Sequence, residues 1–175
     1  ALRLMKEAEK FHRPVICLVD TSGAYPGMEA EERGQGAAIA DNLVAMGALR
    51  TPEITVIMGE GGSGGALGLA VSDRVLMLSD AVYSVVSPEG CSTILFKTAK
   101  RAADAAEALG ITAPFLKDLD IIDGIVDAEG FGTEEFAERF RKCLADQVQE
   151  LEGMTEDELV DARYEKYRAI GRRDS

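Results

Sequence analysis

The sequence predicts an α/β fold with a largely parallel sheet, and three observations support this prediction. Continuous apolar runs at 15–19, 54–58 and 74–78 have the length and hydrophobicity of buried strands. Segments with helical spacing of apolar residues alternate with these runs, as in parallel α/β proteins. The chain has 175 residues, 46% of them apolar, which is enough for one domain with a hydrophobic core.

The expected elements follow one another with few interruptions. We expect helices over 2–12 and 31–49, strands over 15–19, 54–58, 74–78, 82–86 and 121–126, a loop over 20–27 and a short helix ending near residue 72. Ser87 or Pro88 opens a further helix to about residue 97, and helices over 101–109 and 112–119 come next. Two amphipathic helices close the chain, the second introduced by a capping box of Thr155 and Glu158.

Charge and cysteine content exclude several classes of function. The net charge of −12 argues against a basic nucleic-acid-binding surface. The spacings of Cys17, Cys91 and Cys143 match no zinc pattern, so we expect no metal in this chain. Cys17 lies in an apolar run and is expected to be a buried free thiol, which indicates a reducing compartment. Because the sequence has no signal peptide or membrane-spanning run, we expect a cytoplasmic protein without membrane contact.

A glycine-rich turn at 59–66 is the strongest chemical signal in the sequence. It follows the strand at 54–58 and leads into a helix, and it removes nearly every side chain from the junction. The loop at 20–27 follows the preceding strand in the same way. Because parallel strands end at the same edge of a sheet, we expect the two loops to form one site.

Two familiar patterns fit this turn without matching its chemistry. Gly59, Gly61 and Gly64 have the spacing of a dinucleotide fingerprint, with Asp80 about 20 residues on, but the helix ending before Ser72 is short for such a crossover. Gly61, Ser63 and Gly65 fit a nucleophile elbow. However, the chain has one histidine, His12, which precedes the serine and is expected to be exposed. We therefore expect Ser63 to be a small residue that caps the following helix.

A third interpretation uses the backbone alone. The N–H groups of Gly64 and Gly65 lie where a helix begins, and such groups form an oxyanion hole. This interpretation requires neither a basic side chain nor a metal.

Four motifs in order resemble one protein family. They are Asp20-Thr-Ser-Gly-Ala-Tyr-Pro-Gly27, Ala30-Glu-Glu-Arg-Gly-Gln35, Gly59-Glu-Gly-Gly-Ser-Gly-Gly-Ala66 and Tyr83-Ser-Val-Val-Ser-Pro-Glu-Gly-Cys91. Together they resemble the alpha subunits of the carboxyltransferase of bacterial acetyl-coenzyme A carboxylases. The resemblance covers most of residues 1–127 and returns near Arg163 to Gly171.

The resemblance implies a crotonase-like fold of repeated ββα units followed by C-terminal helices. It implies transfer of a carboxyl group from carboxybiotin, on the biotin carboxyl carrier protein, to acetyl-coenzyme A, giving malonyl-coenzyme A for fatty acid synthesis. In such enzymes a beta subunit supplies the other half of the site and mainly holds the thioester, so a hetero-oligomer is expected. The nitrogen of biotin serves as the base after CO2 is released.

The resemblance also implies the site residues. Gly64 and Gly65 would form the alpha-side oxyanion hole facing biotin. The remaining substrate-binding candidates lie in three motifs: Gly23, Ala24, Tyr25, Pro26 and Gly27; Gly61, Gly62 and Ser63; and Ser87, Pro88, Glu89 and Gly90.

Departures from the family pattern leave two alternatives open. Ser22 stands where the family usually has proline, and the region at 129–132 lacks the histidine of the family. We expect a carboxyltransferase core over 1–130 that lacks its upstream part, and a helical extension over 131–175. The alternatives are a subunit of another biotin-dependent acyl-coenzyme A carboxylase or decarboxylase, and a non-catalytic assembly module.

Overall fold

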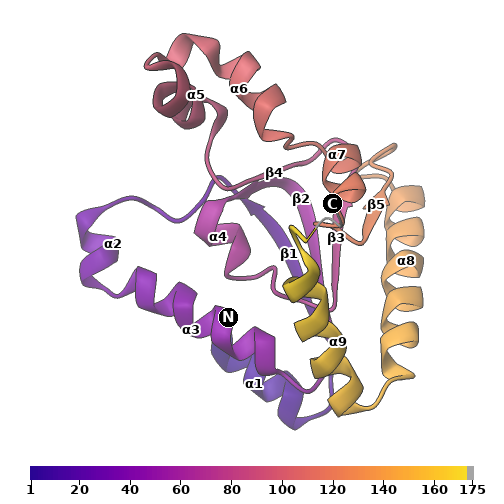
Figure 1. The fold of residues 1–175 in the computed structure, drawn as a ribbon. Coiled ribbons are helices and arrows are strands. Elements are labelled where there is room, and N and C mark those ends of the chain that lie inside the picture. Colours follow the sequence, from indigo (N-terminus) through magenta and orange to yellow (C-terminus); the bar gives the residue numbers. More distant parts are fainter. Residues whose placement is uncertain (173–175) are drawn as a thin grey trace.

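A parallel sheet lies at the centre of the protein in the computed structural model, which describes residues 1–172 (Figure 1). Its strands are β1 (Val15–Thr21), β2 (Glu53–Gly62), β3 (Arg74–Leu78), β4 (Val82–Ser84) and β5 (Gly124–Val126). The order is β1-β2-β3-β5, with β4 paired to β2, and all these pairings are parallel. The expected α/β fold with a parallel sheet is confirmed.

Strand β2 changes partner along its length. Its first part, Ile54–Ile57, pairs with β3, whereas Glu60–Gly62 pairs with β4. The register between β1 and β2 shifts between Val19 and Thr21, at the level where β2 changes partner. The expected end of this strand at residue 58 was wrong, because β4 supplies a backbone ladder that keeps the glycines extended. Strands β4 and β5 are in turn shorter than expected.

The helices are α1 (Leu2–Lys10), α2 (Met28–Glu32), α3 (Gln35–Ala48), α4 (Ser63–Leu67), α5 (Pro88–Phe96), α6 (Ala102–Leu109), α7 (Ala113–Asp118), α8 (Glu134–Glu152) and α9 (Glu156–Ala169), with a 3₁₀ turn η1 at Ala99–Arg101. The single helix expected over 31–49 was wrong. Gly34 adopts a left-handed conformation, with φ of 81°, and separates α2 from α3.

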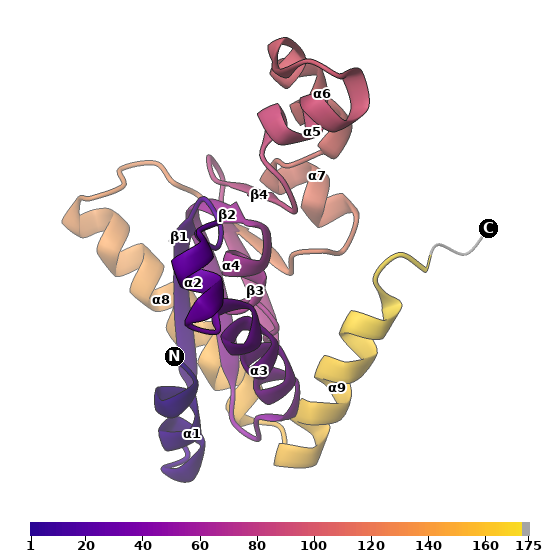
Figure 2. The ribbon, with the colours of Figure 1, turned by 90° about the vertical axis from the view of Figure 1, so that its left-hand side faces the viewer.

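Helices cover both faces of the sheet. Helix α8 lies on one face, and α3, α4 and α9 lie on the other (Figure 1, Figure 2). The main hydrophobic core joins strand residues such as Ile57 and Met77 to Phe136 and Leu151 of α8 and Leu159 of α9. The two closing helices thus share the core of the sheet. Thr155 and Glu158 form the expected capping box.

Helices α5 and α6 stand away from this body and pack mainly on each other (Figure 1, Figure 2). Their base is held by backbone contacts of β4, because Tyr83 N–H donates to the Ile111 carbonyl and Val82 pairs with Thr112. The hairpin therefore projects from the edge of the sheet where β2 and β4 end.

The cysteines carry free thiols. Cys17 is only partly buried, which corrects the expectation of a buried thiol, and burial raises its pKa to about 11. Within residues 1–172, no group of three His, Cys, Asp or Glu side chains is placed to hold a metal ion. None of the described helices has the length and hydrophobicity needed to cross a bilayer.

Candidate active site

The carboxyl ends of β1 and β2 lie next to each other, as expected for neighbouring parallel strands. Asp20 of β1 accepts a hydrogen bond at its Oδ1 from the Glu60 N–H, at 2.9 Å. A Cβ on Gly59 would lie 2.7 Å from that same oxygen. The side chain of Asp20 therefore occupies the space that glycine leaves open, and it holds the two strand ends together.

The glycines at 62 and 65 are required by backbone packing. A Cβ on Gly62 would lie 2.2 Å from the Ser22 carbonyl oxygen, and one on Gly65 would lie 2.7 Å from the Ala24 nitrogen. Gly64 differs, because its Cβ would meet only Ile39 of α3, at 3.7 Å. The loop after β1 thus lies directly against the glycine turn, and only position 64 has room for a side chain.

Helix α4 begins within the glycine turn. Gly62 is its N-cap, so Ser63, Gly64 and Gly65 form the first turn, where N–H groups have no carbonyl one turn earlier to bond. The expectation that Ser63 caps this helix was wrong, since Gly62 is the N-cap and Ser63 is the first residue of the helix. Ser63 has φ of 48°, a left-handed conformation that costs a non-glycine residue about 1–2 kcal/mol.

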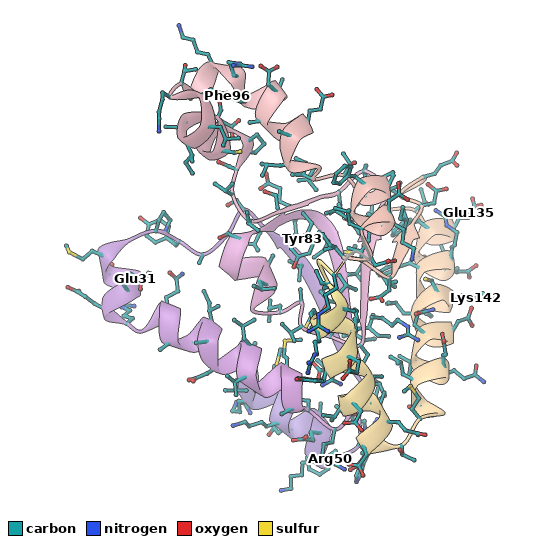
Figure 3. All side chains as sticks on the ribbon, in the orientation of Figure 1. Glu31, Arg50, Tyr83, Phe96, Glu135 and Lys142 are labelled. Atoms are coloured by element: carbon teal, nitrogen blue, oxygen red, sulfur yellow. The ribbon has the colours of Figure 1, made fainter. Side chains whose placement is uncertain are left out.

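An apolar cavity of about 420 Å³ opens beside Gly64. Its walls come from α4, β4 and the segments around α6 and α7, and its lining consists of Ser63, Gly64, Leu67, Tyr83, Ser84, Val85, Leu109, Leu116 and Ile121. Tyr83 lies near the centre of the molecule, below the projecting hairpin (Figure 3). Burial raises the pKa of its hydroxyl, so the side chain is neutral at physiological pH.

A second, more polar cavity of about 320 Å³ shares Ser63 and Ser84 with the apolar cavity. Ser22, Glu60, Gly61, Gly62, Ser63, Val82, Ser84, Val86, Ser87, Pro88, Glu89 and Ile111 line this polar cavity. The structure therefore brings the candidates of the glycine turn and of the 87–89 segment together. Gly90 is absent from the lining, and its N–H instead donates to Ser87 Oγ, the N-cap of α5.

The candidates at 23–27 occupy a different place. Gly23 and Ala24 pack under Gly65 and line neither cavity. Tyr25 is 72% exposed, and its ring lies where a Cβ on Gly27 would be; Pro26 follows it in the loop. The backbone of this loop packs against the glycine turn, while the side chain of Tyr25 is exposed to solvent.

Sequence reasoning missed the apolar wall of the site. Leu109, Leu116 and Ile121 belong to segments more than 40 residues beyond the glycine turn, and their spacing gave only a general core signal. The one histidine, His12, lies elsewhere: its side chain is 81% exposed and its Nδ1 is 3.7 Å from Glu156 of α9. A serine–histidine pair at the turn is therefore excluded, and backbone N–H groups are the electrophilic groups that the turn presents.

Comparison with known proteins identifies the family. A family model described as acetyl co-enzyme A carboxylase carboxyltransferase-like matches residues 1–171. The chain belongs to this family. It is 54% identical over 175 residues to the acetyl-coenzyme A carboxylase carboxyl transferase subunit alpha of Bacillus cytotoxicus, covering 98% of this chain and 54% of that protein. The subunit of the same name from Heliobacterium modesticaldum is also 54% identical, with 98% of this chain and 52% of that protein covered.

Solved structures share the fold of this family member. A Pseudomonas malonate decarboxylase hetero-dimer gives a TM-score of 0.79 at 18% identity, covering 96% of this chain and 71% of that one. Transcarboxylase 12S gives a TM-score of 0.75 at 20% identity, covering 87% of this chain and 30% of that one. The expected crotonase-like fold is thereby confirmed. The chain spans about half the length of the first curated relatives that it matches.

Proposed function

We propose that this chain is the part of a carboxyltransferase alpha subunit that binds carboxybiotin and, with a beta subunit, forms malonyl-coenzyme A from acetyl-coenzyme A. The observation that carries the proposal is the partly exposed first turn of α4 beside the apolar cavity, in a chain more than 50% identical to subunits of that name. The carrier-bound biotin and both coenzyme A thioesters are substrates or products in this proposal.

The chemistry uses the backbone of this chain. The carboxyl group leaves the biotin nitrogen, and negative charge develops on the ureido oxygen. The N–H groups of Gly64 and Gly65 stabilise this oxygen, and the freed nitrogen then removes a proton from the methyl group of the thioester. The resulting carbanion forms the new carbon–carbon bond to CO2. Preorganised donors of this kind contribute most when water is excluded, as beside an apolar cavity.

Substitutions that add a side chain do not test the N–H groups of Gly64 and Gly65 equally well. Any side chain at Gly65 collides with the backbone of Gly23 and Ala24, so loss of activity there would also report loss of structure. A backbone change at Gly64 is cleaner. Glycolic acid in place of Gly64 replaces the amide N–H with an ester oxygen and adds no atoms.

The proposed experiment measures malonyl-coenzyme A formation from carboxylated carrier after mixing with a beta subunit. The ester at Gly64 is expected to lower the rate by roughly 10²–10³-fold. The matched control is the same ester at Gly36, the second residue of α3, which also lies in a first helical turn. Equal rates for the two esters would refute the backbone oxyanion hole.

Two further outcomes separate the alternatives. Turnover that prefers propionyl- or glutaconyl-coenzyme A over the acetyl thioester would favour another biotin-dependent acyl-coenzyme A enzyme. A stable complex with a beta subunit and no turnover with any of these thioesters would favour a non-catalytic assembly module.

A further inference from the structure

Ser63 lies where the two cavities meet. It lines both the apolar and the polar cavity, as does Ser84. The first residues of α4 run along one side of this junction, and the end of β2 leads into it. A side chain at position 63 can therefore contact a ligand that extends from one cavity into the other.

The backbone at this position is one that glycine adopts most easily. Ser63 has φ of 48°, and its neighbours on both sides are glycines: Gly61, Gly62, Gly64 and Gly65. Glycine at 63 would remove the conformational cost. The serine side chain thus adds strain that a fifth glycine would avoid.

The hydroxyl of Ser63 does not contribute to the fold through hydrogen bonds. It has no hydrogen-bond partner among residues 1–172, and it is exposed. The neighbouring serines behave differently: Ser84 Oγ bonds both the N–H and the carbonyl of Val86, and Ser87 Oγ accepts from the Gly90 N–H. Of the two serines that line both cavities, Ser63 is therefore the one whose hydroxyl is available to a ligand.

We propose that Ser63 is a positioning residue whose hydroxyl donates a hydrogen bond to the carboxylate of an N-carboxylated cyclic urea held between the two cavities. This inference rests on the proposed function, because the carboxylated urea is carboxybiotin. Charge-assisted hydrogen bonds from hydroxyl to carboxylate are short and strong, so one such bond fixes the orientation of the carboxyl group. Ser63 forms and breaks no covalent bond, in agreement with the absence of His12 from the lining of both cavities.

The test compares two variants in the reconstituted complex. Ser63→Gly removes the hydroxyl and the strain, and Ser63→Ala removes the hydroxyl and keeps the Cβ. Both are expected to raise KM for the carboxylated carrier by roughly 10- to 100-fold, the effect of one hydrogen bond to a charged group. KM for acetyl-coenzyme A should stay unchanged. Ser63→Gly should also raise Tm by about 2–4 °C, whereas Ser63→Ala should not.

His12→Gly is the matched control, because His12 has φ of 50° and lies outside both cavities. It should relieve comparable strain with unchanged KM for the carrier. Wild-type KM for the carrier in Ser63→Gly, or an equal rise in both KM values, would overturn the role of Ser63. Failure of the wild-type complex to make malonyl-coenzyme A from any carrier would instead overturn the proposed function.

Discussion

Arg163 of α9 and Asp73, the residue directly before β3, form a two-pronged ion pair in the interior of the protein. Arg163 Nε lies 2.8 Å from Asp73 Oδ1, and its Nη2 lies 2.9 Å from Oδ2. The arginine is 1% exposed and also donates to the carbonyls of Met46 and Leu49 at the end of α3. One side chain of the last helix thus joins α3 to the start of the sheet.

Replacement of Arg163 by methionine should destabilise the fold severely. The change leaves the buried Asp73 carboxylate without its cation, which typically costs 3–5 kcal/mol. Urea unfolding followed by circular dichroism measures the loss. The exposed Arg168 of the same helix is the control, and Arg168→Met should change the free energy of unfolding by less than about 0.5 kcal/mol. Adding Asp73→Asn to Arg163→Met should recover part of the loss; no recovery would contradict the assigned cause.

The stability of the protein should also depend on pH through Glu53. Burial raises the pKa of this carboxyl to about 9, and neither of its oxygens has an aligned hydrogen-bond donor, although Arg163 Nη1 lies 2.6 Å from Oε1. We therefore expect Glu53 to be protonated in the folded protein at neutral pH, whereas the unfolded chain releases this proton near its usual pKa of 4.5.

A pKa that is higher in the folded state gives stability that is complete below the unfolded pKa and is lost as pH rises towards the folded pKa. From pH 5 to 8, wild type should therefore lose stability relative to Glu53→Gln, by at most about 1.4 kcal/mol per pH unit. Urea midpoints of both proteins at each pH measure the difference. A difference that does not change with pH would show that Glu53 is ionised in the fold.

Alanine substitutions at Gly62 and at Gly64 should have opposite effects on the stability of the protein. Gly62→Ala places a Cβ 2.2 Å from the Ser22 carbonyl, so the loop or the strand must move. We expect a loss of about 2 kcal/mol or more. Gly64→Ala meets only Ile39 at ordinary contact distance, and alanine favours the helix, so stability should hold or rise by up to about 1 kcal/mol. Thermal unfolding of the two variants would refute the assigned packing if the losses were equal.

The capping box of α9 should be worth a measurable fraction of the stability. Thr155 Oγ1 accepts from the Glu158 N–H, and the Glu158 carboxylate accepts from the Thr155 N–H at 2.7 Å. Thr155→Ala removes the first of these bonds and should cost about 1 kcal/mol. Denaturant unfolding measures it, and Thr155→Ser, which keeps the hydroxyl, is the control. Loss of stability in the serine variant equal to that in the alanine variant would contradict the role of the hydroxyl.

Local patterns in the sequence predicted much of the fold. The apolar runs identified β1 and β3 because a buried parallel strand needs apolar residues on both faces. The capping box of Thr155 and Glu158 could also be predicted, because the two residues are only three positions apart. The end of β2 could not be predicted, because the glycine content of 59–62 is typical of a turn and the pairing with β4 is not visible in the sequence.

The site was predictable only in its backbone part. Glycine spacing located the first turn of α4, although the helix ends at Leu67 and not near residue 72. Leu109, Leu116 and Ile121 reach the apolar cavity through tertiary folding alone. The burial of Arg163 could not be predicted from the sequence for the same reason. On a helix with many charged residues it resembles a solvated side chain, and only the arrangement of Asp73 and the end of α3 gives it partners.

The separation of helices α5 and α6 from the main core affects local unfolding of the protein. None of the buried residues of the main hydrophobic core comes from these helices. We therefore expect the hairpin to melt while the sheet keeps its core contacts, as a separate cooperative unit of low local stability. Its amide protons would exchange with solvent well before those of β2 and β3. The wall that Leu109 gives the apolar cavity would then open and close with the hairpin, without any change in the oxyanion donors of α4.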